Sequence, residues 1–207
     1  MFIIKRSLFG KTIDYVGYLG LAWLVLLIPL AKILPPQIAW ENGILENLQV
    51  VILAIGVLMS FRFYKNSFSE KVKAQWLSIA AFFAILIGRE LSWGRVFFQT
   101  KMTDLGPEFI AMNKVLHHML MQAIILVLII GVIFCLIRNI PWGEVIQVPL
   151  PVMYIVLLMC NIILALLGDR GLIINDLQGE VVEELSELMV YFLIVKIVYY
   201  YSINLKS

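Results

Sequence analysis

The sequence predicts an all-α polytopic integral membrane protein, a single six-helix transmembrane bundle with short loops. Of its 207 residues, 62% are hydrophobic and only 14% are charged, a composition that soluble domains do not have. Several apolar runs approach the roughly 20 residues that an α-helix needs to cross a hydrocarbon core of about 30 Å. We expect spans at about 15–34, 45–64, 76–98, 114–137, 149–168 and 181–201. Because the connections are short, residues 1–207 are expected to form one transmembrane domain.

The first apolar run imitates a secretory signal, because Lys5, Arg6 and Lys11 precede it. However, the run is too long for a signal core, and no small-x-small cleavage site follows before Pro35. We therefore expect it to be the first span.

The orientation of the later spans follows from their basic residues, which gather on one side of the predicted membrane. This side holds Lys5, Arg6, Lys11, Arg62, Lys65, Lys71, Lys73, Arg138 and Lys206. The opposite loops hold only Lys101 and Arg170. The bias predicts a protein of the bacterial inner membrane with both termini in the cytoplasm. It also accounts for the net charge of +2, so no nucleic-acid partner is expected.

The acids gather on the side opposite to the basic residues. Eleven of the 14 are expected in the outer loops or in the outer ends of spans: Glu41, Glu46, Glu90, Asp104, Glu108, Asp169, Asp176, Glu180, Glu183, Glu184 and Glu187. The two histidines, His117 and His118, open the fourth span on the same side. Ionisable groups from four spans are therefore expected at one membrane depth.

Two stretches contribute most of these groups. GRELSWGR, Gly88–Arg95, interrupts the third span with charges that would each cost on the order of 3 kcal/mol at the bilayer centre. In the sixth span, Glu180, Glu183, Glu184 and Glu187 recur at i, i+3, i+4 and i+7, which is one helix face. Because lipid cannot satisfy carboxylates, we expect this face to point into the bundle or into a water-filled cavity.

A structural interpretation of the same residues stands beside the functional one. Acids in the first turn of a helix complement its dipole, and Glu180 would do so without any further role. Arg89 and Glu90 would then pair with groups on other helices, and the tryptophans and tyrosines at span ends would be interface anchors.

Four blocks, ENGILENLQ, RELSWGR, NKVLHHML and EVVEELSEL, resemble motifs of uncharacterised bacterial multispanning membrane proteins. In that family the third helix carries an EEISWGQR signature, and a downstream NLHN supplies a histidine. The residues that match are Glu90, Ser92, Trp93, Gly94, Leu116 and His117. The departures are Arg89 for the first glutamate, Arg95 where glutamine is usual, and His118 for the asparagine.

A more distant similarity links the chain to ceramidase-like hydrolases and to CAAX-type intramembrane proteases. The first group holds zinc with His, Asp and Ser ligands, and the second combines a glutamate-arginine helix with later histidines. Glu90, Arg95 and the histidine pair resemble these elements in kind, although their spacing differs from both groups.

These residue types favour a metal-assisted intramembrane hydrolase or transferase that acts on a lipid or a lipid-linked substrate. Glu90, His117 and Glu184 are the candidate ligands of a divalent cation such as zinc, because one imidazole and two carboxylates leave a position for water. The candidate proton-transfer groups are Glu46 and Glu187, and the candidate phosphate or oxyanion partners are Arg89 and Arg95.

A non-enzymatic function remains the alternative: a membrane subunit within an oligomer or larger complex, an assembly factor, or a cation- or proton-linked transporter. The sequence has no inverted repeat of the kind that forms a transporter site. It also has no GxSxG, HExxH or P-loop motif, so those established enzyme classes have no support.

Overall fold

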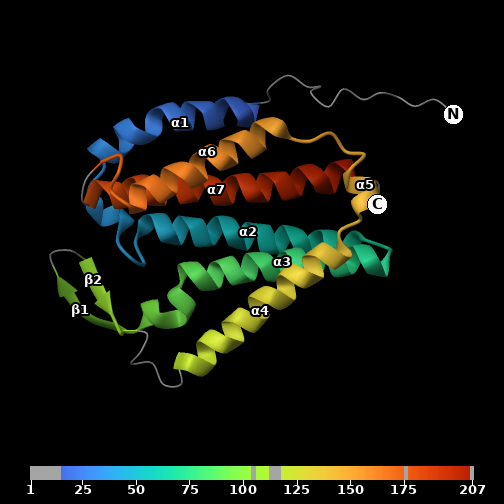
Figure 1. Ribbon diagram of the computed structural model, residues 1–207, viewed down its shortest axis with the longest axis horizontal. Helices are drawn as coiled ribbons and strands as arrows, with labels where there is room; N and C mark the ends of the chain where they lie inside the picture. Colours follow the sequence, from blue (N-terminus) through green and yellow to red (C-terminus); the bar gives the residue numbers. More distant parts are fainter. Residues whose placement is uncertain (1–14, 104–105, 112–117, 175–176, 206–207) are drawn as a thin grey trace. The chain divides into compact units, whose positions relative to one another are not determined.

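The computed structural model describes residues 15–103, 106–111, 118–174 and 177–205, and most of them are helical. The chain divides into two compact units. One combines the chain up to Pro35 with the chain from Pro141 onward, and the other is Pro36–Ile140. Figure 1 follows the order of the elements by colour from the N-terminus to the C-terminus. The expectation of a single transmembrane domain stays a prediction.

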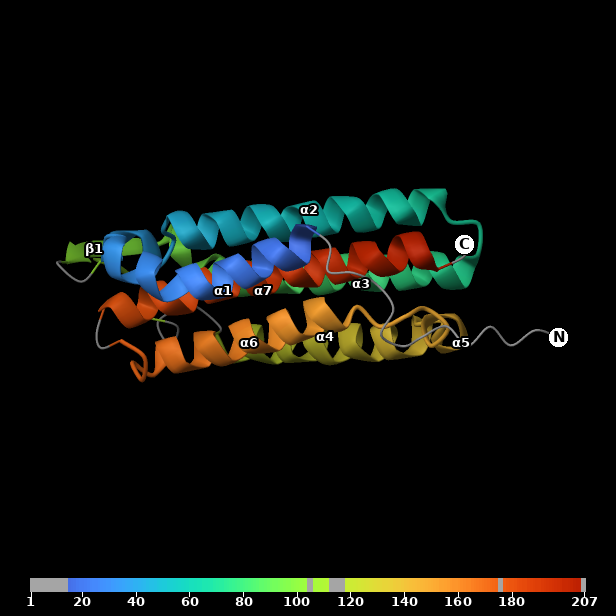
Figure 2. The ribbon, with the colours of Figure 1, turned by 90° about the horizontal axis from the view of Figure 1, so that it is seen from above.

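The first unit consists of helices α1 (Tyr15–Ile33), α5 (Trp142–Val145), α6 (Val152–Asp169) and α7 (Leu177–Asn204). Helices α6 and α7 form a hairpin, and α1 packs against both of them (Figure 2). Tyr154, Leu157 and Leu193 form the centre of its core. Gly20 lets α1 approach closely, because a Cβ there would lie 2.5 Å from Cδ1 of Leu157. The unit is thus held by apolar side chains of three helices.

The α6–α7 hairpin is closed by a contact between two glycines. A Cβ on Gly168 would lie 2.8 Å from the backbone nitrogen of Glu183 and 2.9 Å from the carbonyl oxygen of Gly179. A Cβ on Gly179 would in turn lie 2.9 Å from the carbonyl oxygen of Gly168. The two backbones therefore touch, and this contact fixes the first turns of α7, which carry the acids, against the end of α6.

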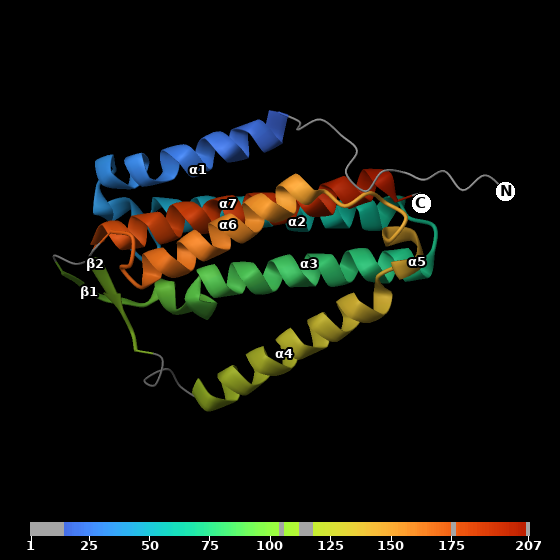
Figure 3. The ribbon, with the colours of Figure 1, turned by 45° about the horizontal axis from the view of Figure 1, so that its top comes forward.

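The second unit consists of η1 (Pro36–Ala39), α2 (Ile44–Asn66), α3 (Glu70–Glu90), η2 (Ser92–Phe97), β1 (Gln99–Thr103), β2 (Gly106–Phe109) and α4 (His118–Asn139). Helices α2 and α3 pack along their lengths, with the fully buried ring of Phe83 against Gly56. Helix α4 meets α3 near the C-terminal end of α4, where Nδ2 of Asn139 donates to Oγ of Ser78 over 3.2 Å. Figure 3 shows α4 diverging from α3 toward its other end.

The strands β1 and β2 form an antiparallel hairpin shortly after η2, in the stretch that the sequence predicts to be a loop between the third and fourth spans. Lys101 pairs with Glu108 across the strands, with 3.1 Å between Nζ and Oε2. The hydroxyl groups of Thr100 and Thr103 donate to carbonyl oxygens of the partner strand. Its hydrogen bonds make this short segment a defined element.

Among the described residues, five helical segments are long and apolar enough to cross a membrane: α1, α2 with the preceding η1, α3, α4 and α6. The all-α class and the repeated apolar helices predicted from the sequence are confirmed. Helix α7 spans 28 residues but carries four glutamates and Lys196, and it is not among these five. The third predicted span differs from the structure at its end, because α3 ends at Glu90 and not near residue 98.

Candidate functional site

A left-handed turn ends α3 within the SWG motif. Ser92, Trp93 and Gly94 have φ values of 44°, 54° and 90°, a region that residues with a side chain rarely adopt. The turn is held by a hydrogen bond from the Gly94 amide to the Leu91 carbonyl oxygen over 2.8 Å. The Trp93 ring folds back onto α3, where a Cβ on Gly88 would lie 2.7 Å from Cζ3. The chain therefore leaves the helix axis here, although the apolar run continues.

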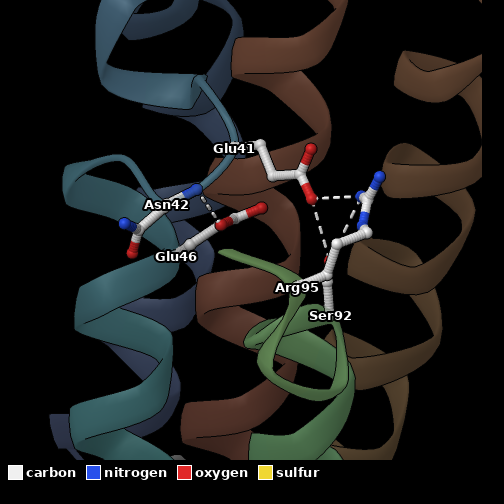
Figure 4. A network of polar contacts seen from close by, with 5 residues as sticks. All are labelled: Glu41, Asn42, Glu46, Ser92 and Arg95. Carbon is white, nitrogen blue, oxygen red and sulfur yellow. Dashed lines mark hydrogen bonds and ion pairs between the residues drawn. The ribbon is translucent and has the colours of Figure 1, made fainter. Parts of the chain in front are cut away.

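The turn directs Ser92 and Arg95 at the carboxylate of Glu41, which lies between η1 and α2. Figure 4 shows this network in close view. Oε1 of Glu41 accepts a hydrogen bond from Oγ of Ser92 over 2.9 Å, and it also accepts one from Nη2 of Arg95. The side chains of Glu41 and Arg95 are only 30% and 28% exposed. Partial burial should make this ion pair stronger than a fully solvated pair.

Glu41 is held in place by a tight turn at the start of α2. Asn42 has a φ of 59°, and a Cβ on Gly43 would lie only 2.4 Å from the Trp40 carbonyl oxygen. Nδ2 of Asn47 donates to the Gly43 carbonyl oxygen over 2.7 Å. The asparagine and the glycine of the ENG sequence thus set the direction of the glutamate.

Glu46, a candidate proton-transfer residue, lies in the first turn of α2 next to this network. Its Oε2 accepts a hydrogen bond from the backbone amide of Asn42 (Figure 4). This contact resembles a capping box, in which a glutamate reaches back to the residues before its helix. Glu46 therefore has a structural role, and its role in proton transfer stays a prediction.

Glu90 is the most deeply buried acid among the residues that the structure describes, with a side chain 4% exposed. Nη1 of Arg89 donates to its Oε1 over 2.9 Å, and the Arg89 side chain is 53% exposed. The two residues are neighbours, so a half-exposed arginine is paired with a buried carboxylate. A buried carboxylate paired in this way contributes little net stability but is costly to leave unpaired.

The remaining candidate acids lie on α7, in the first unit. Val181, Val182 and Leu185 are buried there, on the face of the helix opposite to the glutamates. The expectation that the glutamate face points into the bundle stays a prediction. Glu183, Glu184 and Glu187 are half-buried, whereas Glu180 is more exposed. Partial loss of hydration raises the pKa of the Glu180 carboxyl.

The predicted metal ligands belong to different parts of the chain. Glu90 lies in the second unit and Glu184 in the first, and His117 lies outside the described residues. Within the ranges that the structure describes, no three His, Cys, Asp or Glu residues are arranged to hold a metal ion. The convergence of Glu90, His117 and Glu184, and with it the zinc assignment, stays a prediction.

Two residues of the site received no role from the sequence. Glu41 counted only as one of the outer acids, and Ser92 only as part of a motif. The ENG sequence predicts a turn before α2. It does not indicate the partner of Glu41, because Arg95 lies 54 residues further along the chain. Only the antiparallel packing of α2 and α3 brings these groups together.

Trp40, the neighbour of Glu41, contacts the other end of the segment that follows α3. Gly106 has a φ of 123°, and a Cβ there would lie 3.1 Å from Cγ of Trp40. The turn end of the β-hairpin therefore rests on the indole ring. Nε1 of Trp40 is buried and has no hydrogen-bond partner among the described residues.

Comparison of the sequence with protein-family models gives no match, and comparisons with curated proteins and with solved structures give none either.

Proposed function

We propose that the chain is a multi-pass protein of the bacterial inner membrane with six spans and both termini in the cytoplasm. The five apolar helices support the membrane placement. Helix α7 supplies the sixth span over about 181–201, with its acids at the outer end. The basic residues on alternate connections support the orientation.

Cysteine labelling in intact cells tests this topology, in a background that lacks Cys135 and Cys160. We expect Gln37→Cys and Leu172→Cys to react with a membrane-impermeant maleimide, and Phe68→Cys and Ile146→Cys to react only after lysis. All four positions are exposed in the structure, so burial does not limit labelling. The reverse pattern would place the acids in the cytoplasm and contradict the proposal.

We further propose that Glu41, Ser92 and Arg95, termed the α2–α3 site, form the reactive part of an intramembrane hydrolase or transferase for a lipid or lipid-linked substrate. The observation that carries this proposal is the shared Oε1 of Glu41. One carboxylate oxygen accepts both the Ser92 hydroxyl and the Arg95 guanidinium. A nucleophile within 2.9 Å of a base, beside a cation, is the arrangement that nucleophilic catalysis needs.

The chemistry follows from these contacts. Oγ of Ser92 attacks a phosphorus or carbonyl carbon of the substrate, and Glu41 takes the hydroxyl proton. The bond to the alcohol leaving group breaks, and this alcohol receives the proton from Glu41. Arg95 stabilises the negative charge on the substrate oxygens. Water then releases the group from Ser92 in a hydrolase, and a second alcohol does so in a transferase.

The sequence predicts a different form of the same activity, in which a metal ion assists the reaction. A divalent cation on Glu90, His117 and Glu184 would activate water and polarise the substrate. Substitution of those three residues or of Glu187 would then lower activity more than substitution of Ser92. Elemental analysis of the purified protein, with Glu184→Gln and His117→Asn as comparisons, distinguishes this form from the first.

The test is lipid turnover by the purified protein in nanodiscs made from the lipids of its host, followed by mass spectrometry. We expect Ser92→Ala and Glu41→Gln to abolish turnover while the protein stays folded. Glu180→Gln is the matched control, because it removes an acid outside the site. Turnover that survives both changes would contradict the serine form. A lack of turnover in the wild-type protein would contradict the proposed enzyme.

A membrane subunit or assembly factor is the second candidate, and a specific observation favours it. The Glu41–Arg95 pair joins the start of α2 to the chain after α3, which is a sufficient structural reason for both residues. In that case the Glu41 and Arg95 variants would lose folded protein or its complex, and Ser92→Ala would be tolerated.

A further inference from the structure

The segment from Phe97 through β1 exposes large apolar side chains shortly after the end of a membrane-length helix. The side chains of Phe97 and Phe98 are 71% and 66% exposed, and that of Met102 is 61% exposed. Val96, directly before them, is only 4% exposed. The exposure therefore begins sharply at Phe97, after the chain has packed against its own unit.

Continuity along the chain sets the depth of these side chains. Helix α3 has the length and composition of a span and ends at Glu90, and the six residues of η2 directly follow Leu91. The left-handed turn at Ser92–Gly94 bends the chain away from the helix axis, so it does not continue outward as a helix. Phe97 and Phe98 are therefore held near the end of the span.

The backbone of the hairpin also indicates which layer of the membrane can surround it. A two-stranded sheet has unpaired amide and carbonyl groups along both edges, and the hydrocarbon core cannot satisfy them. Aromatic and apolar side chains next to such a backbone gain most at the boundary between head groups and acyl chains. The Lys101–Glu108 pair, with side chains 62% and 51% exposed, suits the head-group side of that boundary.

We infer that residues 97–103 and 106–109 form an interfacial hairpin that inserts Phe97 and Phe98 into the lipid surface at the outer end of α3. Its partner is the bilayer itself. The inference rests on the membrane placement proposed above. Arg95 lies two residues before Phe97 and would therefore lie at the depth of the lipid phosphates. A lipid substrate could then reach Arg95 directly from the bilayer.

The hairpin is held in this position from both ends. Arg95 binds Glu41 at its root, and Gly106 rests on Trp40 after its turn. Both contacts lie within the second unit, so the placement of the hairpin on α2 and α3 does not depend on the rest of the chain.

Spin-label accessibility in vesicles of phosphatidylethanolamine and phosphatidylglycerol tests the inference. Single cysteines at Phe97, Phe98 and Lys101, in a background without Cys135 and Cys160, carry a nitroxide. We expect the ratio of oxygen collisions to nickel-chelate collisions to be several-fold higher at positions 97 and 98 than at 101. A ratio at 97 and 98 as low as that at 101 would place them in water and overturn the inference.

Two further outcomes are distinguishable. Labels at 97 and 98 that neither reagent reaches would show that protein covers the hairpin, either another part of the chain or a second copy, and this also overturns the inference. A label at Leu128, an exposed side chain in the middle of α4, tests the membrane placement separately. If Leu128 also reports water, the membrane proposal itself fails. If only positions 97 and 98 report water, only the interfacial hairpin fails.

Discussion

Trp40 and Glu41 are neighbours in the sequence and contact opposite ends of the segment that follows α3. The Trp40 indole supports Gly106, just after the hairpin turn, and the Glu41 carboxylate binds Arg95 before the first strand. Two consecutive residues therefore hold both ends of the hairpin in place. Any change in the turn that precedes α2 is expected to move both ends of this segment together.

The Glu41–Arg95 pair should contribute measurable coupling energy to folding. We expect a double-mutant cycle with Glu41→Gln and Arg95→Gln to give about 1 kcal/mol in the free energy of unfolding in detergent, since both side chains are largely buried. The same cycle on Lys101 and Glu108, which are more than half exposed, should give about 0.5 kcal/mol or less. Equal coupling in the two cycles would contradict a special role for the first pair.

Gly168→Ala should destabilise the first unit, because its new Cβ meets the backbone of α7 and not a flexible side chain. We expect a loss of about 1–3 kcal/mol in the free energy of unfolding. Gly131→Ala, on α4, is the matched control, because no atom lies within 4 Å of its new Cβ. Alanine favours helix there, so this variant should be neutral or slightly more stable. Similar losses in both variants would count against the backbone contact.

Glu180 should make the free energy of unfolding decrease as pH rises, because its carboxyl is partly desolvated in the folded chain. Burial raises the pKa of its carboxyl in the folded chain, so folding favours the protonated form. The stabilising contribution is complete below the unfolded pKa and is lost as pH rises through the raised value. Glu180→Gln should therefore unfold at a higher temperature than the wild-type protein at neutral pH, with the difference shrinking toward acidic pH. A less stable variant at neutral pH would show that the helix dipole prevails over desolvation.

Gly106→Ala should loosen the hairpin without breaking the Glu41–Arg95 pair. The φ of 123° disfavours any side chain, and the new Cβ would press on Trp40. We expect faster amide hydrogen exchange across residues 99–109, with unchanged exchange in α2. Gly143→Ala is the control, because an added Cβ there would meet no described residue within 4 Å beyond its own stretch of helix. Unchanged exchange in the hairpin would show that the indole contact does not hold it.

The sequence predicts helices better than it predicts how they end and pair. Apolar runs predict the long apolar helices, whereas the direction in which the acid face of α7 points stays a prediction. Hydropathy extends the third span to residue 98, because Val96, Phe97 and Phe98 are apolar. The helix stops at Glu90, because packing of Trp93 on Gly88 supports a left-handed turn that local preference alone would not select.

The pairings of the site depend on tertiary packing in the same way. The sequence shows that Arg95 needs a counter-charge near the membrane, but several outer acids would satisfy that need. The antiparallel packing of α2 against α3, together with the tight Asn42–Gly43 turn, selects Glu41. A network of this kind becomes visible only once the fold is known.

In the proposed membrane placement, the early end of α3 has a consequence for the surrounding bilayer. Its uncharged stretch, Ala74–Gly88, is about 22 Å long at the rise of an α-helix. This is shorter than a hydrocarbon core of about 30 Å. Such a hydrophobic mismatch is relieved by local thinning of the bilayer or by water and head groups that enter beside the helix. In this placement, lipid head groups would therefore reach the exposed Arg89 side chain at the end of α3, whereas the Glu90 carboxylate stays buried in the protein.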